Sequence, residues 1–107
     1  MKITKDYPGL VDIGWAYKFE GSIKTMESIE IDIGAKWLYV TEGIESGGGI
    51  EAGLSIICKQ VLSFRFNLFA GTATWKKATP EEMEVICAKV NGGEIKSGTL
   101  KIINEKP

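Results

Sequence analysis

Residues 38–70 read LYVTEG IESGGG IEAGLS IICKQV LSFRFN LFA when the chain is divided into units of six. A large aliphatic residue opens every unit, and Ile23 and Ile29 keep the same interval upstream. An α-helix repeats every 3.6 residues and a simple strand every two, so a sustained period of six indicates a chain that turns a corner at fixed intervals. The spacing predicts a β-solenoid. The opening residues are Leu38, Ile44, Ile50, Ile56, Leu62 and Leu68.

Each unit predicts a short strand with one buried side. Positions one and three of a strand point to the same face, and position two points to the other. The third position is apolar or small in most units, and the second is mostly polar: Lys24, Glu30, Tyr39, Glu45 and Glu51. One such strand cannot bury its face alone, but stacked turns can. Residues 35–37 look like a three-residue insertion that interrupts the phase.

Residues 1–20 precede the repeat and predict an N-terminal strand. Large apolar side chains alternate there with smaller or polar ones, which is the period of a half-buried strand. Such a strand would cover the first open turn of a solenoid, and an ordinary sheet strand fits the pattern equally well. The alternating residues are Val11, Ile13, Trp15, Tyr17 and Phe19.

The pattern changes after residue 56. Leu62, Phe64, Phe66 and Leu68 alternate with polar residues, which predicts a longer amphipathic strand. We expect these side chains to be too large for a narrow solenoid interior, so that the strand begins a cap.

Residues 72–107 predict a β-rich C-terminal cap, because the open end of a solenoid exposes unpaired backbone that needs covering. Residues 79–82 carry the N-cap, proline and acidic residues of a helix start. The Asn-Gly-Gly sequence at 91–93 signals a hairpin. Strands 85–90 and 94–103 would flank it, with Leu100 and Ile102 on one face.

These observations predict one all-β domain spanning residues 1–107. Its centre, residues 21–71, is a short single-stranded β-solenoid (a β-helix), with the N-terminal strand at one end and the β-rich cap at the other. The alternative is an irregular β-sandwich in which the spacing of six is coincidental.

Composition narrows the functional classes. Net charge is −1 and Arg65 is the only arginine, whereas nucleic-acid binders carry a basic excess, so we do not expect a nucleic-acid partner. The sequence contains no apolar run of the kind found in a signal peptide or a membrane span. We therefore expect a cytoplasmic protein in a bacterial host cell. Two cysteines, Cys58 and Cys87, are expected to be free buried thiols, with a disulfide as the alternative.

Few groups in the chain point to catalysis. The absence of histidine removes the commonest general base and argues against a zinc site. Residues 47–52 fit the dinucleotide-loop pattern G-x-G-x-x-A, but a strand-like sequence follows where a helix is required, so we expect no cofactor. Carboxylates on stacked turns could pair for acid–base chemistry or cation binding, or simply solvate the outer face: Glu30, Asp32, Glu42, Glu45 and Glu51.

Candidate partner-binding residues are aromatic or charged and fall on the predicted outer face or in irregular segments. Trp37 ends the insertion, and insertions in repeats bulge from one face, often the binding face. Tryptophan is enriched in protein interfaces, although capping of the core would equally explain it. The full candidate set is Trp37, Tyr39, Glu45, Glu51, Trp75, Lys76 and Lys77.

Two resemblances bear on function. The spacing resembles that of hexapeptide-repeat acyltransferases, which are longer and rely on a catalytic histidine, so that likeness implies the coil and not the activity. The string at 43–56 (GIESGGGIEAGLSI) also resembles small uncharacterised hexapeptide-repeat proteins of gut Firmicutes and their phages and mobile elements. Residues 11–15, 69–72 and Trp75 extend that likeness. It implies an accessory gene, and small accessory proteins of this kind often bind and block a host enzyme.

We therefore expect a non-enzymatic protein-binding module with a protein partner, in its sharpest form an inhibitor of a bacterial defence protein such as a CRISPR nuclease. A structural or self-assembling solenoid module is the first alternative, since open ends favour homo-oligomers. A carboxylate-dependent enzyme is the second.

Overall fold

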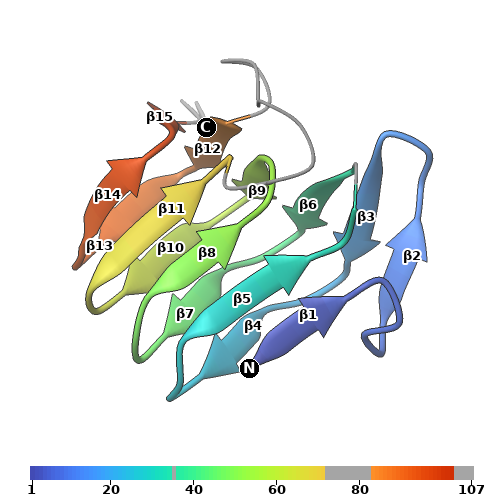
Figure 1. Ribbon diagram of the computed structural model, residues 1–107, viewed down its shortest axis with the longest axis horizontal. Helices are drawn as coiled ribbons and strands as arrows, with labels where there is room; N and C mark the ends of the chain where they lie inside the picture. Colours follow the sequence, from blue (N-terminus) through green and yellow to red (C-terminus); the bar gives the residue numbers. More distant parts are fainter. Residues whose placement is uncertain (35, 72–82, 103–107) are drawn as a thin grey trace.

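The computed structural model describes residues 1–34, 36–71 and 83–102, which form strands and no α-helix (Figure 1). The strands are short, three or four residues each, and a corner separates each from the next. They are β1 (Lys2–Thr4), β2 (Leu10–Asp12), β3 (Ala16–Phe19), β4 (Ile23–Thr25), β5 (Ile29–Asp32), β6 (Trp37–Val40), β7 (Ile44–Ser46), β8 (Ile50–Ala52), β9 (Ile56–Cys58), β10 (Val61–Phe64), β11 (Asn67–Ala70), β12 (Glu84–Cys87), β13 (Lys89–Asn91), β14 (Glu94–Ser97) and β15 (Thr99–Ile102).

The chain winds as a β-solenoid with three sheets as its walls. From β3 onward, consecutive strands fall on different sheets, and each pairs in parallel with strands one circuit away. The five-stranded sheet has the order β1-β5-β8-β11-β14, the four-stranded sheet β13-β10-β7-β4, and the six-stranded sheet β15-β12-β9-β6-β3-β2. The predicted all-β solenoid is confirmed, and the alternative of a sandwich with coincidental spacing is wrong. We call one circuit of three strands a rung.

The register explains the period of six. Leu38 pairs with Ile56 and Ile44 with Leu62, each eighteen positions along the chain, so one rung holds three units. Ile23 pairs with Ile44, twenty-one positions along. The chain between β5 and β6 is therefore three residues longer than in the regular units. The expected insertion at 35–37 matches this only in part, because Trp37 is the first residue of β6 and is paired with Ala16.

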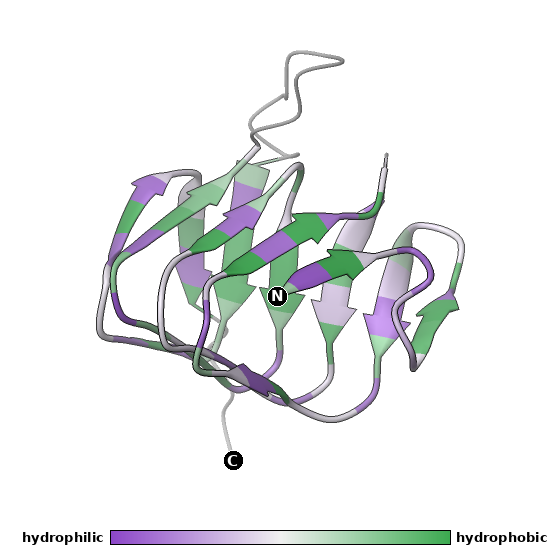
Figure 2. Cartoon of the chain, turned by 60° about the horizontal axis from the view of Figure 1, so that its bottom comes forward, coloured by the Kyte–Doolittle hydropathy of each residue, from purple (hydrophilic) through white to green (hydrophobic). Residues whose placement is uncertain are grey.

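The first and third positions of each unit form the core. Leu38 and Val40 are fully buried, whereas Trp37 and Tyr39 between and beside them are only half-buried. One continuous cluster of such inward side chains runs through the rungs. Figure 2 shows hydrophobic segments recurring from strand to strand, with hydrophilic segments between them. Alternation along a strand and stacking between rungs together produce this apolar column.

The predicted long strand over residues 62–68 is wrong. It is two strands, β10 and β11, separated by a corner at Arg65 and Phe66. Phe64 is only 2% exposed, so the interior does accept an aromatic ring. Gly93 makes the room, because a Cβ atom there would lie 2.2 Å from two carbons of the Phe64 ring.

The N-terminal end is a hairpin and not the single strand expected from the alternation. β2 and β3 pair antiparallel, and Gly14 adopts a φ of 97° in the turn between them. The Asp12 side chain accepts a hydrogen bond from the Gly14 N–H at 2.9 Å. Tyr7 and Phe19 pack against the core at this end, with their ring centroids 5.9 Å apart.

The C-terminal segment continues the coil. Residues 91–93 form a corner between β13 and β14 and not the expected hairpin, because β13 and β14 pair in parallel with β10 and β11. β15 pairs in parallel with β12, which places Leu100 and Ile102 over the buried Val85 and Cys87. The helix start expected at 79–82 lies outside the described residues.

Candidate protein-binding surface

Three aromatic side chains gather on the outside of the six-stranded sheet. Trp37 and Tyr39 lie on β6 and point outward because Leu38 and Val40 point into the core. Trp15 joins them from the β2–β3 hairpin: its ring centroid is 6.3 Å from that of Trp37, nearly edge-on, and 5.7 Å from that of Tyr39. We call Trp15, Trp37 and Tyr39 the aromatic cluster. Trp15 remains 53% exposed.

Backbone register holds the cluster in place. β6 lies between β3 and β9 and pairs with both, so Tyr39 has a register partner on each side, and Trp37 has one on β3. Ala16 is the register partner of Trp37 and is fully buried, yet it lies outside the core cluster. Since register partners share a face, Ala16 must be covered from the outside, by the same layer of side chains as the aromatic cluster.

An apolar row extends the cluster along the sheet. Tyr39 pairs in register with Ile57, and Ile57 with Ile86, both of which are partly exposed. In the other direction Tyr39 pairs with Lys18, and Lys18 with Val11, which is 57% exposed. We call the aromatic cluster with Val11, Ile57 and Ile86 the apolar surface. Lys18 separates Val11 from Tyr39, so one charged side chain interrupts the row. Exposed apolar patches rimmed by polar residues are typical of interaction sites.

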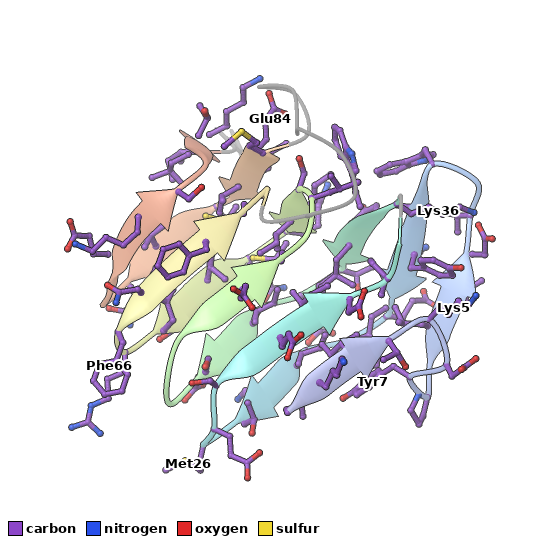
Figure 3. The ribbon with its side chains drawn as sticks, viewed as in Figure 1. Lys5, Tyr7, Met26, Lys36, Phe66 and Glu84 are labelled. Carbon is purple, nitrogen blue, oxygen red and sulfur yellow. The ribbon has the colours of Figure 1, made fainter. Side chains whose placement is uncertain are left out.

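Ion pairs border the apolar surface. At the hairpin end, the Lys36 ammonium group pairs with the Asp12 carboxylate and lies 5.2 Å from the Tyr17 ring centroid. Asp12 and Tyr17 are register partners on the face opposite Val11, so this pair lies behind the edge of the apolar surface. At the opposite end Lys101 pairs with Glu84 at 2.6 Å. Lys36 and Glu84 are labelled in Figure 3. An apolar centre with a charged border is the usual anatomy of a protein interface.

The Asp12 pair gives this region a pH dependence. The hydrogen bond from Lys36, and then that from the Gly14 N–H, hold the pKa of Asp12 below its ordinary value of 3.8. The contribution of Asp12 to the hairpin is therefore fully present above that value and is lost as pH falls through the lower folded pKa. We expect tryptophan fluorescence to change with a midpoint below pH 3.8, because Trp15 lies in the same hairpin. Asp12→Asn should lack this step; an identical acid transition in that variant would contradict the assignment.

The remaining candidate residues lie elsewhere on the coil. Glu45 is on the four-stranded sheet, between Lys24 and Ser63 in register. Glu51 is on the five-stranded sheet, so neither acid joins Trp37 and Tyr39, and the two cannot act as a carboxylate pair. Trp75, Lys76 and Lys77 lie outside the described residues.

The five-stranded sheet carries a groove of about 530 Å³, lined in part by Glu30, Glu51, Phe66 and Phe69. Glu30 and Glu51 are register partners on adjacent strands, so stacking does bring these two carboxylates together. Among the residues that the structure describes, no group of three or more Cys, Asp or Glu side chains could hold a metal ion. Glu30 and Glu51 therefore belong to no such group within that part of the chain.

Cys58 and Cys87 are adjacent in the core as free thiols. They follow the register pair Ile57 and Ile86 by one position, and both are fully buried. A hydrogen bond with Cys87, together with burial, raises the pKa of the Cys58 thiol far above its usual range. The same hydrogen bond lowers the pKa of the Cys87 thiol. Thiolate is the reactive form, so Cys58 is protected both by its raised pKa and by burial, whereas burial alone protects Cys87.

We expect neither thiol to react with a soluble aromatic disulfide reagent in the native protein, and both to react in guanidinium chloride. Absorbance of the released aromatic thiol measures this directly. Rapid labelling of native protein would show that the rungs around β9 and β12 open readily.

No family model, curated protein or solved structure matches the chain. Over the described residues, there is no helix of the length and apolarity needed to cross a membrane.

Trp15 is the member of the aromatic cluster that sequence reasoning left out of its candidate set. The alternation over residues 11–19 placed it on a capping strand with its neighbours. The signal that could have identified it is Gly14, since an isolated glycine in an alternating run indicates an irregularity in the strand, and here its φ of 97° places it in the hairpin turn.

Proposed function

We propose that this chain is a non-enzymatic protein-binding module whose partner docks on the apolar surface of the six-stranded sheet. The observation that carries the proposal is Trp15, which is 53% exposed while its ring is in contact with Trp37 and Tyr39. Tryptophan and tyrosine are the residues most enriched among interface hot spots. Their exposure as a cluster leaves apolar area that a partner would remove from water.

The solenoid suits this role because it orders the surface before binding. Trp37, Tyr39 and Ile57 lie on adjacent parallel strands, each paired on both sides. A partner therefore does not have to order the backbone beneath its contacts. A preorganised surface loses less entropy on association and so retains more of its interaction energy as affinity.

The sharper form of the proposal is that the partner is a bacterial defence protein, such as a CRISPR nuclease, which the chain inhibits by covering part of its surface. Support for this form comes from the resemblance of residues 43–56 to small mobile-element proteins. Affinity capture from lysates of several bacterial hosts, followed by an interference assay with a plasmid target, tests it. Undiminished interference in the presence of the protein would rule out inhibition.

The test of the binding surface uses the partner recovered by that capture. We expect Trp15→Ala and Trp37→Ala each to weaken binding by about thirtyfold, since hot-spot truncation costs about 2 kcal/mol or more. Isothermal titration calorimetry measures the change. Phe66→Ala is the matched control, because Phe66 is similarly exposed at 57% and lies at a different corner, far from Lys36 (Figure 3). A loss of affinity with Phe66→Ala and none with the two tryptophan variants would show that the partner binds at the β10–β11 corner and not on the apolar surface.

A further inference from the structure

The two ends of the solenoid are finished differently. At the C-terminal end, β13, β14 and β15 are the outermost strands of their sheets, and among the described residues no strand pairs with their outer edges (Figure 1). Leu100 and Ile102 are 41% and 53% exposed, although Val85 and Cys87, on which they stack, are fully buried. Over the described residues, the core column therefore ends in an apolar rung that no further strand covers.

The N-terminal end lacks such a rung. Tyr7, Leu10 and Phe19 pack against the core there, and the antiparallel strand β2 forms the edge of the six-stranded sheet. Ile3 and Ile23 remain almost completely buried. Head-to-tail stacking would thus place the open C-terminal rung of one copy on the covered N-terminal end of another. On the six-stranded sheet, the edge strand β2 runs antiparallel to its neighbour and would interrupt the parallel ladder. An open C-terminal end is complemented best by another C-terminal end.

We propose that two copies of this chain associate through their C-terminal ends to form a closed, two-fold symmetric dimer. A two-fold axis across the end reverses the direction of the strands, so β14 would pair antiparallel with β14 of the second copy. On the other two walls, β13 would lie against β15 of the second copy. The exposed side chains of Leu100 and Ile102 would then be enclosed between the two columns.

The charges of β14 fit this arrangement. Glu94 and Lys96 are both exposed, on either side of Ile95, and form an ion pair at 3.1 Å within one chain. The register of β14 on β11 shifts between Ile95 and Ser97, so Lys96 is an extra residue without a register partner on β11. When two antiparallel β14 strands are centred on Ile95, each Glu94 faces Lys96 of the other copy. Opposite charges directly across a strand pair stabilise it, and like charges destabilise it. β14 is thus complementary to itself in the antiparallel direction.

Sedimentation velocity from low micromolar to millimolar concentration tests the dimer. We expect a monomer–dimer equilibrium with no larger species. Leu100→Lys should leave only monomer, because it places a charge in the enclosed rung. Lys96→Glu should weaken the dimer by about tenfold, since it creates two like-charge pairs related by symmetry. The double variant Glu94→Lys with Lys96→Glu exchanges the charges, and should restore the wild-type dissociation constant.

Circular dichroism would reveal whether Leu100→Lys fails to fold. Lys96 is exposed, so Lys96→Glu and the exchange variant should fold normally and test the dimer independently of Leu100→Lys. Trp15→Ala, on the apolar surface, is the matched control and should leave the dimer unchanged. A monomer at every concentration, assembly beyond the dimer, failure of the charge exchange to restore association, or loss of the dimer with Trp15→Ala would each overturn the proposal.

Discussion

Replacing Ile50 with alanine is expected to lower the free energy of unfolding by about 3 to 4 kcal/mol. Ile50 is 1% exposed and stacks in register between Ile29 and Leu68, which are equally buried. Backbone ladders on both sides fix the spacing of these residues, so the neighbours cannot collapse into the cavity. The loss is large beside the total stability of a small domain, about 5 to 15 kcal/mol. Urea titration followed by circular dichroism measures it.

Glu51→Ala is the matched control, because Glu51 is the next residue on the same strand and points outward. Its register partner is Glu30, and like charges in register repel each other. We expect the unfolding free energy to stay within about 0.5 kcal/mol of the wild type, with any change a gain. Equal losses for the two variants would show that Ile50 and Glu51 do not differ in burial as the solenoid requires.

Gly47→Ala is expected to destabilise the protein by about 3 kcal/mol, at the upper end for overpacking. A Cβ atom at Gly47 would lie 2.3 Å from the carbonyl oxygen and 2.7 Å from the carbonyl carbon of Met26 on the neighbouring rung. Backbone atoms cannot rotate away as the tip of a side chain can. The φ angle of Gly47 is not in the left-handed region, so the requirement for glycine is one of space alone.

Gly34→Ala separates space from conformation. Gly34 has a φ of 74°, but nothing lies within 4 Å of an added Cβ atom. The expected cost is therefore that of the left-handed backbone alone, about 1 kcal/mol. Thermal unfolding of both variants under the same conditions gives the comparison. A larger loss for Gly34→Ala than for Gly47→Ala would contradict the close approach of the rungs at the β7–β8 corner.

The solenoid was predictable because one large aliphatic residue recurs every six positions and marks its period. Ile44 and Leu62 are separated by the length of one rung, and both are buried in register. Even the insertion before Leu38 was visible as a break in phase. Each unit is too short to form anything but one strand and one corner. The position of a residue within its unit therefore determines both its local conformation and its register partner on the next rung.

The two ends of the chain were mispredicted because the sequence pattern at each end is compatible with two different structures. An alternating run containing Gly14 fits one long strand or two strands of a hairpin, and the left-handed φ of the glycine decided for the hairpin. Residues 91–93 fit a hairpin turn or a solenoid corner. Pairing with β10 and β11, which is not local in sequence, decided for the corner. Space for Phe64 depends on Gly93 in the next rung, a contact that no local pattern reveals.

The binding surface was predictable in part. Alternation along β6 puts Trp37 and Tyr39 outside, and the sequence identified both. Trp15 reaches them only because the hairpin folds back on β3, and Ile57 and Ile86 join them only through register. The structure was therefore needed to show which residues lie beside Trp37 and Tyr39 on neighbouring strands. It was also needed to show that Glu45 and Glu51 lie on different sheets.

The eighteen-residue step between register partners makes this architecture adjustable in length. A segment of that length, inserted or removed at equivalent corners, returns the chain to the same wall with the same side chains facing inward. Stability in such arrays is close to a sum over neighbouring repeats, so gene duplication can lengthen the column without redesign of its ends. The distance between the aromatic cluster and the C-terminal end can thus evolve in steps of one strand spacing, about 4.8 Å.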